Sequence, residues 1–291
     1  MQQNAQKQEH TKSWYAATVN EVTDYPELQG TESADICVVG GGFSGVSTAL
    51  TLAERGYSVA LVEANRIGWG ASGRNGGQLI HGGCGLDKLL KKHGDSIADA
   101  VWEMKWRGND IIRERVKKYA IDCDLKDGWA EVAVKPRQVE WLHEYAEDRK
   151  AHNAPATWEI WDREETRENL GTDAFHGTFI CYRDGHLHPL NLCIGEARAA
   201  HGLGVRIFEQ SPVIDIEHGP RPKVKTTTGS IQANSVILCG NAYSHFEGLK
   251  NLVFPAGSYV IATEPLGDDV VQRINKKDIS VCDLNEVVDY Y

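Results

Sequence analysis

Three glycines spaced as Gly40-x-Gly42-x-x-Gly45 lie between a short apolar run, DICVV, and a segment with apolar residues at helical spacing, VSTALTLAERGY. Glycines at these places permit a tight turn, a close approach of the backbone to a pyrophosphate and close packing of helix on strand. The phosphates would lie at the positive end of a helix that begins near Phe43. The spacing therefore predicts a phosphate-binding turn.

An acid follows at the distance that a dinucleotide-binding unit needs. Glu63 lies 23 residues after Gly40, in a second apolar run, SVALVEA. A carboxylate at that strand end can accept hydrogen bonds from both hydroxyls of an adenosine ribose, and it disfavours a ribose 2′-phosphate. Strand, turn, helix, strand and acid in register predict dinucleotide binding and argue against NADP. The alternative is a glycine turn with a structural role alone.

A glycine-rich segment with two arginines, EANRIGWGASGRNGGQ, begins at this acid and covers residues 63–78. A nicotinamide enzyme usually continues with a helix and a third parallel strand. Here the pattern instead predicts one long helix, from about Asp95 to Tyr119. A dinucleotide other than NAD is therefore implied.

The later elements alternate in the same α/β manner. Helices are expected over Pro136–His152 and Asp162–Leu170, and a strand at GWAEVAV. Strand patterns then dominate, in VRIF, VIDIEHG, KVKTTTG, SIQANSVILCG and SYVIATEP. A hairpin or meander is indicated by the turn residues Gly219, Pro220 and Gly229.

Composition limits the partners. A net charge of −10 and a pI near 5.6 argue against nucleic acid or an anionic membrane surface. The polar amino-terminal stretch is neither a signal peptide nor a membrane anchor, and no apolar run approaches the length of a spanning helix. Seven widely spaced cysteines, none in a CxxC pair, fit a reducing compartment. We expect a cytoplasmic protein.

Three longer stretches allow a family to be suggested: VVGGGFSGVSTALTLAERGYSVALVEANRIGWGASGRNGGQ, GHLHPLNLCIGEA and VILCGNAYS. Together they resemble the D-amino-acid oxidase superfamily of FAD enzymes, and most nearly its gamma-glutamylputrescine oxidoreductases and their glycine and sarcosine oxidase relatives. SWYAATVN, IIRERVKKYAIDCD and VVDYY are similar to segments of the same subgroup, so the resemblance covers nearly the whole chain. Members of the family continue well past the position of Tyr291, which implies a chain truncated at its carboxyl end.

The resemblance implies an α/β fold with FAD as cofactor. An FAD-binding Rossmann-like domain of the glutathione-reductase type would be interleaved with an antiparallel substrate sheet. The expected division is an amino-terminal extension (1–30), a first FAD-binding part (31–85), a helical part that begins the substrate domain (86–190), a second FAD-binding part with the meander (191–245) and incomplete substrate-domain strands (246–291).

The resemblance also implies roles for individual residues. The backbone around Ala71–Gln78 would pass the pyrophosphate and run along the isoalloxazine ring, although a surface salt bridge is an alternative for Arg74. Arg66 would lie beside the ribose or adenine, and the Val213 backbone would approach the adenine unless this valine only packs in the core. The cofactor-binding residues predicted from the spacing and the resemblance are Gly40, Gly42, Phe43, Ser44, Gly45, Glu63, Ala64, Arg66, Gly70, Ala71, Ser72, Arg74, Asn75, Gly76, Gly77, Gln78, Val213, Gly240 and Asn241.

Histidines and one glutamine are the candidates beyond the cofactor. Gln78 and His81 are catalytic candidates that would face the substrate cavity, with a packing role as the alternative for each. His186-x-His188 would put two imidazoles on one face of a strand, a spacing that can hold a metal, but no third ligand is near in the sequence. We therefore expect no metal and a role for both histidines in the crossover between domains. Pro189 is expected to begin a helix.

The implied chemistry is removal of a hydride from a carbon that bears an amine, with O2 or another electron acceptor reoxidising the flavin. The substrate would be a small amine such as gamma-glutamylputrescine. Sarcosine, glycine or a D-amino acid as substrate, a dehydrogenase, and a non-catalytic flavoprotein subunit are the alternatives.

Overall fold

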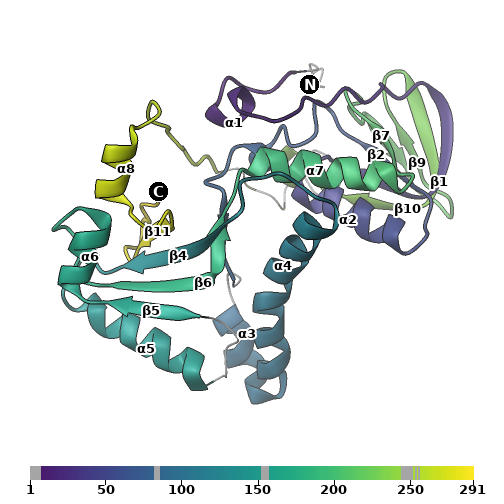
Figure 1. Ribbon diagram of the computed structural model, residues 1–291. Coiled ribbons are helices and arrows are strands. Elements are labelled where there is room, and N and C mark those ends of the chain that lie inside the picture. Colours follow the sequence, from purple (N-terminus) through teal and green to yellow (C-terminus); the bar gives the residue numbers. More distant parts are fainter. Residues whose placement is uncertain (1–7, 82–85, 152–156, 244–251, 253, 255) are drawn as a thin grey trace. The chain divides into compact units, whose positions relative to one another are not determined.

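The computed structural model describes residues 8–81, 86–151, 157–243, 252, 254 and 256–291 (Figure 1). The chain divides into two compact units, each of which collects segments distant in sequence. The first unit contains Met1–Asn75, Arg115–Cys123 and Pro189–Val260. The second contains Gly76–Glu114, Asp124–His188 and Ile261–Tyr291.

The first unit is built on a six-stranded sheet of order β7-β2-β1-β10-β9-β8. Its strands are β1 (Gly30–Val39), β2 (Val59–Val62), β7 (Arg206–Phe208), β8 (Asp215–Glu217), β9 (Lys223–Lys225) and β10 (Gly229–Leu238). The pairs among β7, β2, β1 and β10 are parallel, whereas β10, β9 and β8 pair antiparallel. The predicted meander and the strand that returns from it to the nucleotide sheet are therefore confirmed.

Helices α2 (Phe43–Glu54) and α7 (Pro189–Gly202) pack together against one face of this sheet (Figure 1). Side chains of β1 alternate between two cores: Val38 belongs to the cluster that contains α2 and α7, while Cys37 and Val39 belong to the cluster on the other side. Burial on both faces explains why these strands are continuous apolar runs rather than alternating ones. Short helical turns complete the unit: α1 (Trp14–Ala17), η1 (Ala71–Gly73) and η3 (Asn241–Tyr243).

The second unit is built on a five-stranded sheet centred on β6. Its strands are β3 (Gln78–Leu79), β4 (Lys126–Val132), β5 (Trp158–Trp161), β6 (Thr178–His186) and β11 (Ser280–Asp283). β3, β4 and β5 pair antiparallel with β6, and β11 extends the sheet parallel to β4. The helical elements are α3 (Leu86–His93), η2 (Gly94–Ile97), α4 (Ala98–Lys118, whose last residues belong to the first unit), α5 (Gln138–Ala151), α6 (Arg163–Leu170) and α8 (Asp268–Ile274).

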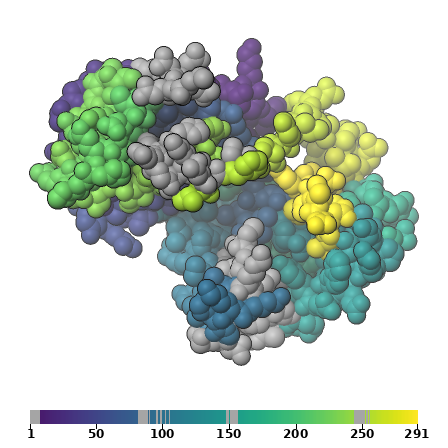
Figure 2. Space-filling view, turned by 180° about the vertical axis from the view of Figure 1, so that it is seen from behind, coloured from purple at the N-terminus to yellow at the C-terminus, as the bar shows by residue number. Residues whose placement is uncertain are grey.

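Most of the predicted elements are present. The long helix begins at Ala98 after a 3-10 turn, and α5, α6 and the start of α7 at Pro189 lie where the pattern placed them. The strand predicted at SYVIATEP is wrong, because residues 258–265 form no strand. Tyr259 and Ile261 are 94% and 92% exposed there, so the alternation of apolar residues in this segment does not correspond to a buried face of a strand. Figure 2 shows this yellow-green segment at the surface.

No described helix has the length and apolar character that crossing a bilayer requires.

Candidate functional site

The glycine turn lies where β1 ends and α2 begins. Gly40 has φ of +112°, and a Cβ there would lie 2.6 Å from the carbonyl oxygen of Cys239, which follows β10. A Cβ at Gly45 would lie 1.8 Å from the carbonyl oxygen of Gly40. Gly42 is the extended N-cap of α2. The first and third glycines are therefore required by close backbone contacts.

The glycine-rich segment folds back onto the start of this helix. The Ser72 hydroxyl accepts the N–H of Phe43 at 2.9 Å, and a Cβ on Gly42 would lie 2.8 Å from the same oxygen. Asn75 Nδ2 donates to the carbonyl oxygens of Ala71 and Ser72, at 3.1 and 2.9 Å. Ser72 thus accepts a hydrogen bond from one of the N–H groups that the first turn of a helix leaves without an internal partner. The next N–H groups in that turn belong to Ser44 and Gly45.

Glu63 lies directly after β2 and faces this turn. Its Oε2 accepts the N–H of Gly41 at 2.6 Å, and its Oε1 accepts the N–H of Asn65 at 2.9 Å. Burial raises the pKa of Glu63 above its usual value, against the lowering effect of these two bonds. Each carboxylate oxygen has two acceptor positions, so the geometry leaves acceptor capacity for hydroxyl donors.

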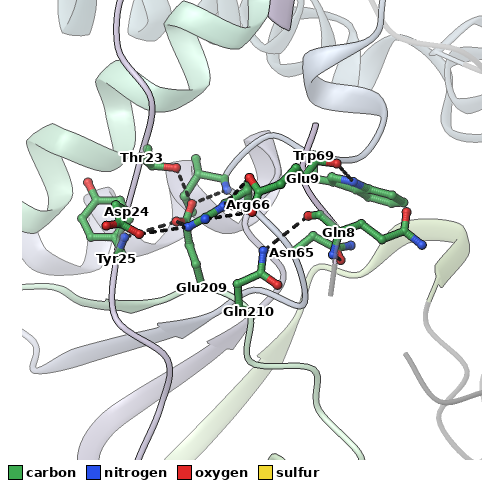
Figure 3. Close-up of polar contacts among 11 residues, drawn as sticks. Gln8, Glu9, Thr23, Asp24, Tyr25, Asn65, Arg66, Trp69, Glu209 and Gln210 are labelled. Carbon is green, nitrogen blue, oxygen red and sulfur yellow. Dashed lines mark hydrogen bonds and ion pairs between the residues drawn. The ribbon is translucent and has the colours of Figure 1, made fainter. Parts of the chain in front are cut away.

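Arg66 is engaged by carboxylates of the protein itself (Figure 3). Its Nε and Nη2 donate to Glu9, each at 2.9 Å to one carboxylate oxygen, and its Nη1 donates to Glu209 at 2.9 Å. Asp24 lies 3.4 Å from Nη1. The approach of Arg66 to a ribose or adenine stays a prediction.

Glu209 is a site residue that no sequence pattern indicated. It follows β7, is fully buried and accepts the N–H groups of Ile67 and Tyr25 at 2.7 and 3.2 Å, together with the Thr23 hydroxyl. Its contacts lie more than 140 residues away in the chain, and no local motif contains that information.

Aromatic and turn residues surround the rest of the segment. The Arg74 guanidinium carbon lies 4.3 Å from the centroid of the Trp69 ring, and Trp69 meets Tyr243 edge-on at 5.7 Å. A Cβ on Gly70 would lie 3.7 Å from the Tyr243 ring. Four other predicted residues belong to the same unit: half-buried Ala64, Val213 against the second core cluster, and Gly240 and Asn241, which come after Cys239 at the end of β10.

The predicted residues Gly76, Gly77, Gln78 and His81 belong to the second unit. A Cβ on Gly76 would lie 2.3 Å from the Tyr290 ring, and Gly77, with φ of +71°, accepts the N–H of Leu187 at 2.8 Å. Gln78 begins β3, and its Nε2 lies 3.5 Å from the carbonyl oxygen of Val281. The structure thus places the predicted residues up to Asn75, together with Val213, Gly240 and Asn241, in one unit, and Gly76 to His81 in the other.

His81 is buried and fixed by Asp184. The Asp184 carboxylate accepts the main-chain N–H of His81 at 2.7 Å and contacts its Nδ1, and it also accepts from Asn109 at 3.0 Å. Trp106 stacks on the imidazole at 3.9 Å. A hydrogen-bonded carboxylate on Nδ1 fixes both tautomer and ring orientation. The sequence showed nothing of this pairing.

The two histidines of the expected crossover lie at the end of β6. His186 Nε2 is 2.9 Å from the carbonyl oxygen of Asp278, while His188 is buried. Within the described ranges, ligand-type atoms gather instead at His81, Cys181 and Asp184, within 4.8 Å of one another. Burial raises the pKa of Cys181 to about 11, which disfavours the thiolate that a metal needs.

Comparison with known proteins gives one family model that matches residues 35–291, described as DAO, FAD dependent oxidoreductase. A probable oxidoreductase, OrdL, of Haemophilus influenzae is 41% identical over 98% of this chain and 68% of its own length. The gamma-glutamylputrescine oxidoreductase of Escherichia coli is 40% identical over 97% of this chain and 67% of its own. The chain thus spans about two thirds of these relatives.

Solved structures with the same fold include an L-amino acid deaminase from Proteus vulgaris, with a TM-score of 0.64 and 24% identity over 77% of this chain and 51% of that one. The glycine oxidase from Geobacillus kaustophilus has a TM-score of 0.56 and 22% identity, and the match covers 73% of this chain and 56% of that one. The chain therefore spans about half of the solved structures, and these likenesses concern the fold.

Proposed function

Because the chain belongs to the DAO family of FAD-dependent oxidoreductases, we propose that it oxidises the C–N bond of a small amine of the gamma-glutamylputrescine type, with O2 as the final acceptor. The observation that carries the proposal is the 40% identity to a gamma-glutamylputrescine oxidoreductase along almost the whole chain. The first unit would be the FAD-binding domain and the second would contribute to the substrate domain.

The residues present fit the adenosine and phosphate half of FAD. Two glycines have no space for a side chain, as their Cβ atoms would lie 1.8 and 2.6 Å from backbone oxygens, so the turn leaves the main chain bare at the start of α2. N–H groups at a helix start bind phosphate, and the Glu63 carboxylate has acceptor capacity for a ribose diol. We propose that these groups hold the adenosine diphosphate moiety.

When bound, the flavin supplies a hydride acceptor for the carbon that bears the amine. The protein would orient that carbon and exclude water while the C–N bond becomes an imine, which water then hydrolyses to a carbonyl compound and an amine or ammonia. The two electrons and the protons would pass to O2 and give hydrogen peroxide. His81, with its Nδ1 against Asp184, is our candidate for holding a proton near the amine.

Two measurements test this function. Purified chain with bound FAD should bleach when gamma-glutamylputrescine is added without oxygen, and peroxide should form when air is admitted. Putrescine, sarcosine, glycine and D-alanine in the same peroxide assay rank the substrates. Bleaching with sarcosine or glycine but not with gamma-glutamylputrescine would refute the substrate, and FAD that none of these amines bleaches would indicate a non-catalytic flavoprotein.

A further inference from the structure

The amino-terminal residues Gln8 and Glu9, here called the strap, lie against the loop that follows β2 (Figure 3). The N–H of Gln8 donates to Asn65 Oδ1 at 2.9 Å. The indole Nε1 of Trp69 donates to the carbonyl oxygen of Glu9 at 3.0 Å. Side chains of this loop therefore hold the main chain of the strap at two successive residues.

An ion pair adds a third contact. Two nitrogens of the Arg66 fork donate to the Glu9 carboxylate, and the third donates to Glu209. The Arg66 side chain is 15% exposed and that of Glu209 is 0% exposed, so a buried carboxylate already fixes the cation that the strap meets. A bidentate contact to such a preoriented guanidinium is stronger and more directional than a contact between two mobile surface chains.

These contacts lead to the acid of the nucleotide site. Asn65, which accepts from the strap through its side chain, donates its own N–H to Glu63 Oε1 at 2.9 Å. The other oxygen of Glu63 accepts the N–H of Gly41 in the glycine turn at 2.6 Å. A continuous line of hydrogen bonds thus runs from Gln8 to the phosphate-binding turn.

We propose that the strap is a positioning element of the FAD site, which holds the loop after β2 and the Glu63 carboxylate in the arrangement that retains the adenosine end of the cofactor. The proposal rests on the FAD binding proposed above. A binding loop that is already ordered loses less entropy when its ligand binds. Without the strap, the loop opens more often, and the cofactor leaves faster.

The test compares the release of FAD from four forms of the full chain. Glu9→Gln removes the charge of the strap, Trp69→Phe removes the indole donor but keeps a ring, and Glu21→Gln is the matched control. Glu21 belongs to the same unit and pairs with Arg198 at 3.3 Å, in a surface pair whose cation is 52% exposed. Release is followed by the rise in flavin fluorescence after dilution, and the apoprotein is melted in parallel.

Glu9→Gln should release FAD about fivefold faster than the unchanged chain, as expected from the loss of one partly sheltered ion pair. Trp69→Phe should also release it faster, and the control should match the unchanged chain. High salt should bring the unchanged chain toward the Glu9→Gln rate, because it screens the pair. Apoprotein melting midpoints should stay together in all four forms.

Equal release rates in all forms that bind FAD would overturn the proposal. So would faster release in step with a lower apoprotein melting midpoint, because that pattern describes general destabilisation. A chain that takes up no FAD in a direct titration would instead refute the proposed function on which the strap depends, and it would remove the strap proposal with it.

Discussion

Gly45→Ala tests the glycine turn most directly. The added Cβ would lie 1.8 Å from the carbonyl oxygen of Gly40, about 1.6 Å closer than the 3.4 Å at which ordinary contact begins. Helix α2 cannot retreat freely, because Val46, Ala49 and Leu50 on its inner face are fully buried. Overpacking of this kind costs about 1–3 kcal/mol, which lowers a melting midpoint by roughly 2–12 °C in a chain of this size.

Gly202→Ala is the matched control for this change. Gly202 ends α7 in the same unit, and a Cβ there would have nothing within 4 Å. This variant should be neutral or more stable by up to about 1 kcal/mol. The assays are thermal melting of the apoprotein and titration with FAD. If Gly45→Ala melts with the control and binds FAD as the unchanged chain does, the close contact does not shape the turn.

Three further predictions concern buried charges. Because burial raises the pKa of Glu63, the folded chain binds its proton up to a higher pH than the unfolded chain, so apoprotein stability should fall as the pH rises from about 4.5 through the raised pKa. Urea melts of Glu63→Ala should show a flatter dependence in that range, and an unchanged slope would contradict the assignment. Arg115→Met removes the ion partner 2.9 Å from buried Glu196 and should lower the free energy of unfolding in urea by about 3–5 kcal/mol, because it leaves a buried charge unpaired. The double variant Arg115→Met/Glu196→Met should recover most of that stability, and no recovery would contradict this explanation. In Asp184→Asn, an amide NH2 replaces one of the two carboxylate oxygens that contact the main-chain N–H and the Nδ1 of His81. The change should lower the free energy of unfolding by about 1–3 kcal/mol, and an unchanged melting midpoint would refute the pairing.

The sequence predicted those parts of the fold that local pattern determines. The structure has β1 at DICVV, α2 after the glycine turn and β2 in the run up to Glu63. Each of these segments has its own hydrophobic periodicity and is bounded by turn residues. The meander followed from turn residues between short alternating runs. SYVIATEP has the same alternation yet forms no strand, since a strand exists only where a partner pairs with it.

The local part of the candidate site was predictable for a similar reason, and its long-range contacts were not. The positions of Gly40, Gly45 and Glu63 could be predicted because their spacing along one βαβ unit fixes where they lie in space. Glu209 and Asp184 stayed hidden because each meets its partners across 75 or more residues of chain, and an isolated acid in a sequence has no feature that distinguishes a buried carboxylate from a solvated one.

The charges around Glu63 also bear on how the proposed site would hold the phosphates of FAD. Glu9 and Glu209 share the single guanidinium of Arg66, so these three side chains together contribute negative charge beside Glu63. The guanidinium of Arg66 is therefore already paired with carboxylates of the protein itself. On the proposed function, the N–H groups at the start of α2 and the guanidinium of Arg74, which lies over the Trp69 ring within the same segment, would neutralise the phosphates. A glycine turn with bare main chain suits such an acidic neighbourhood, because backbone dipoles would attract the cofactor without disturbing the Glu63 carboxylate that we propose as its ribose ligand.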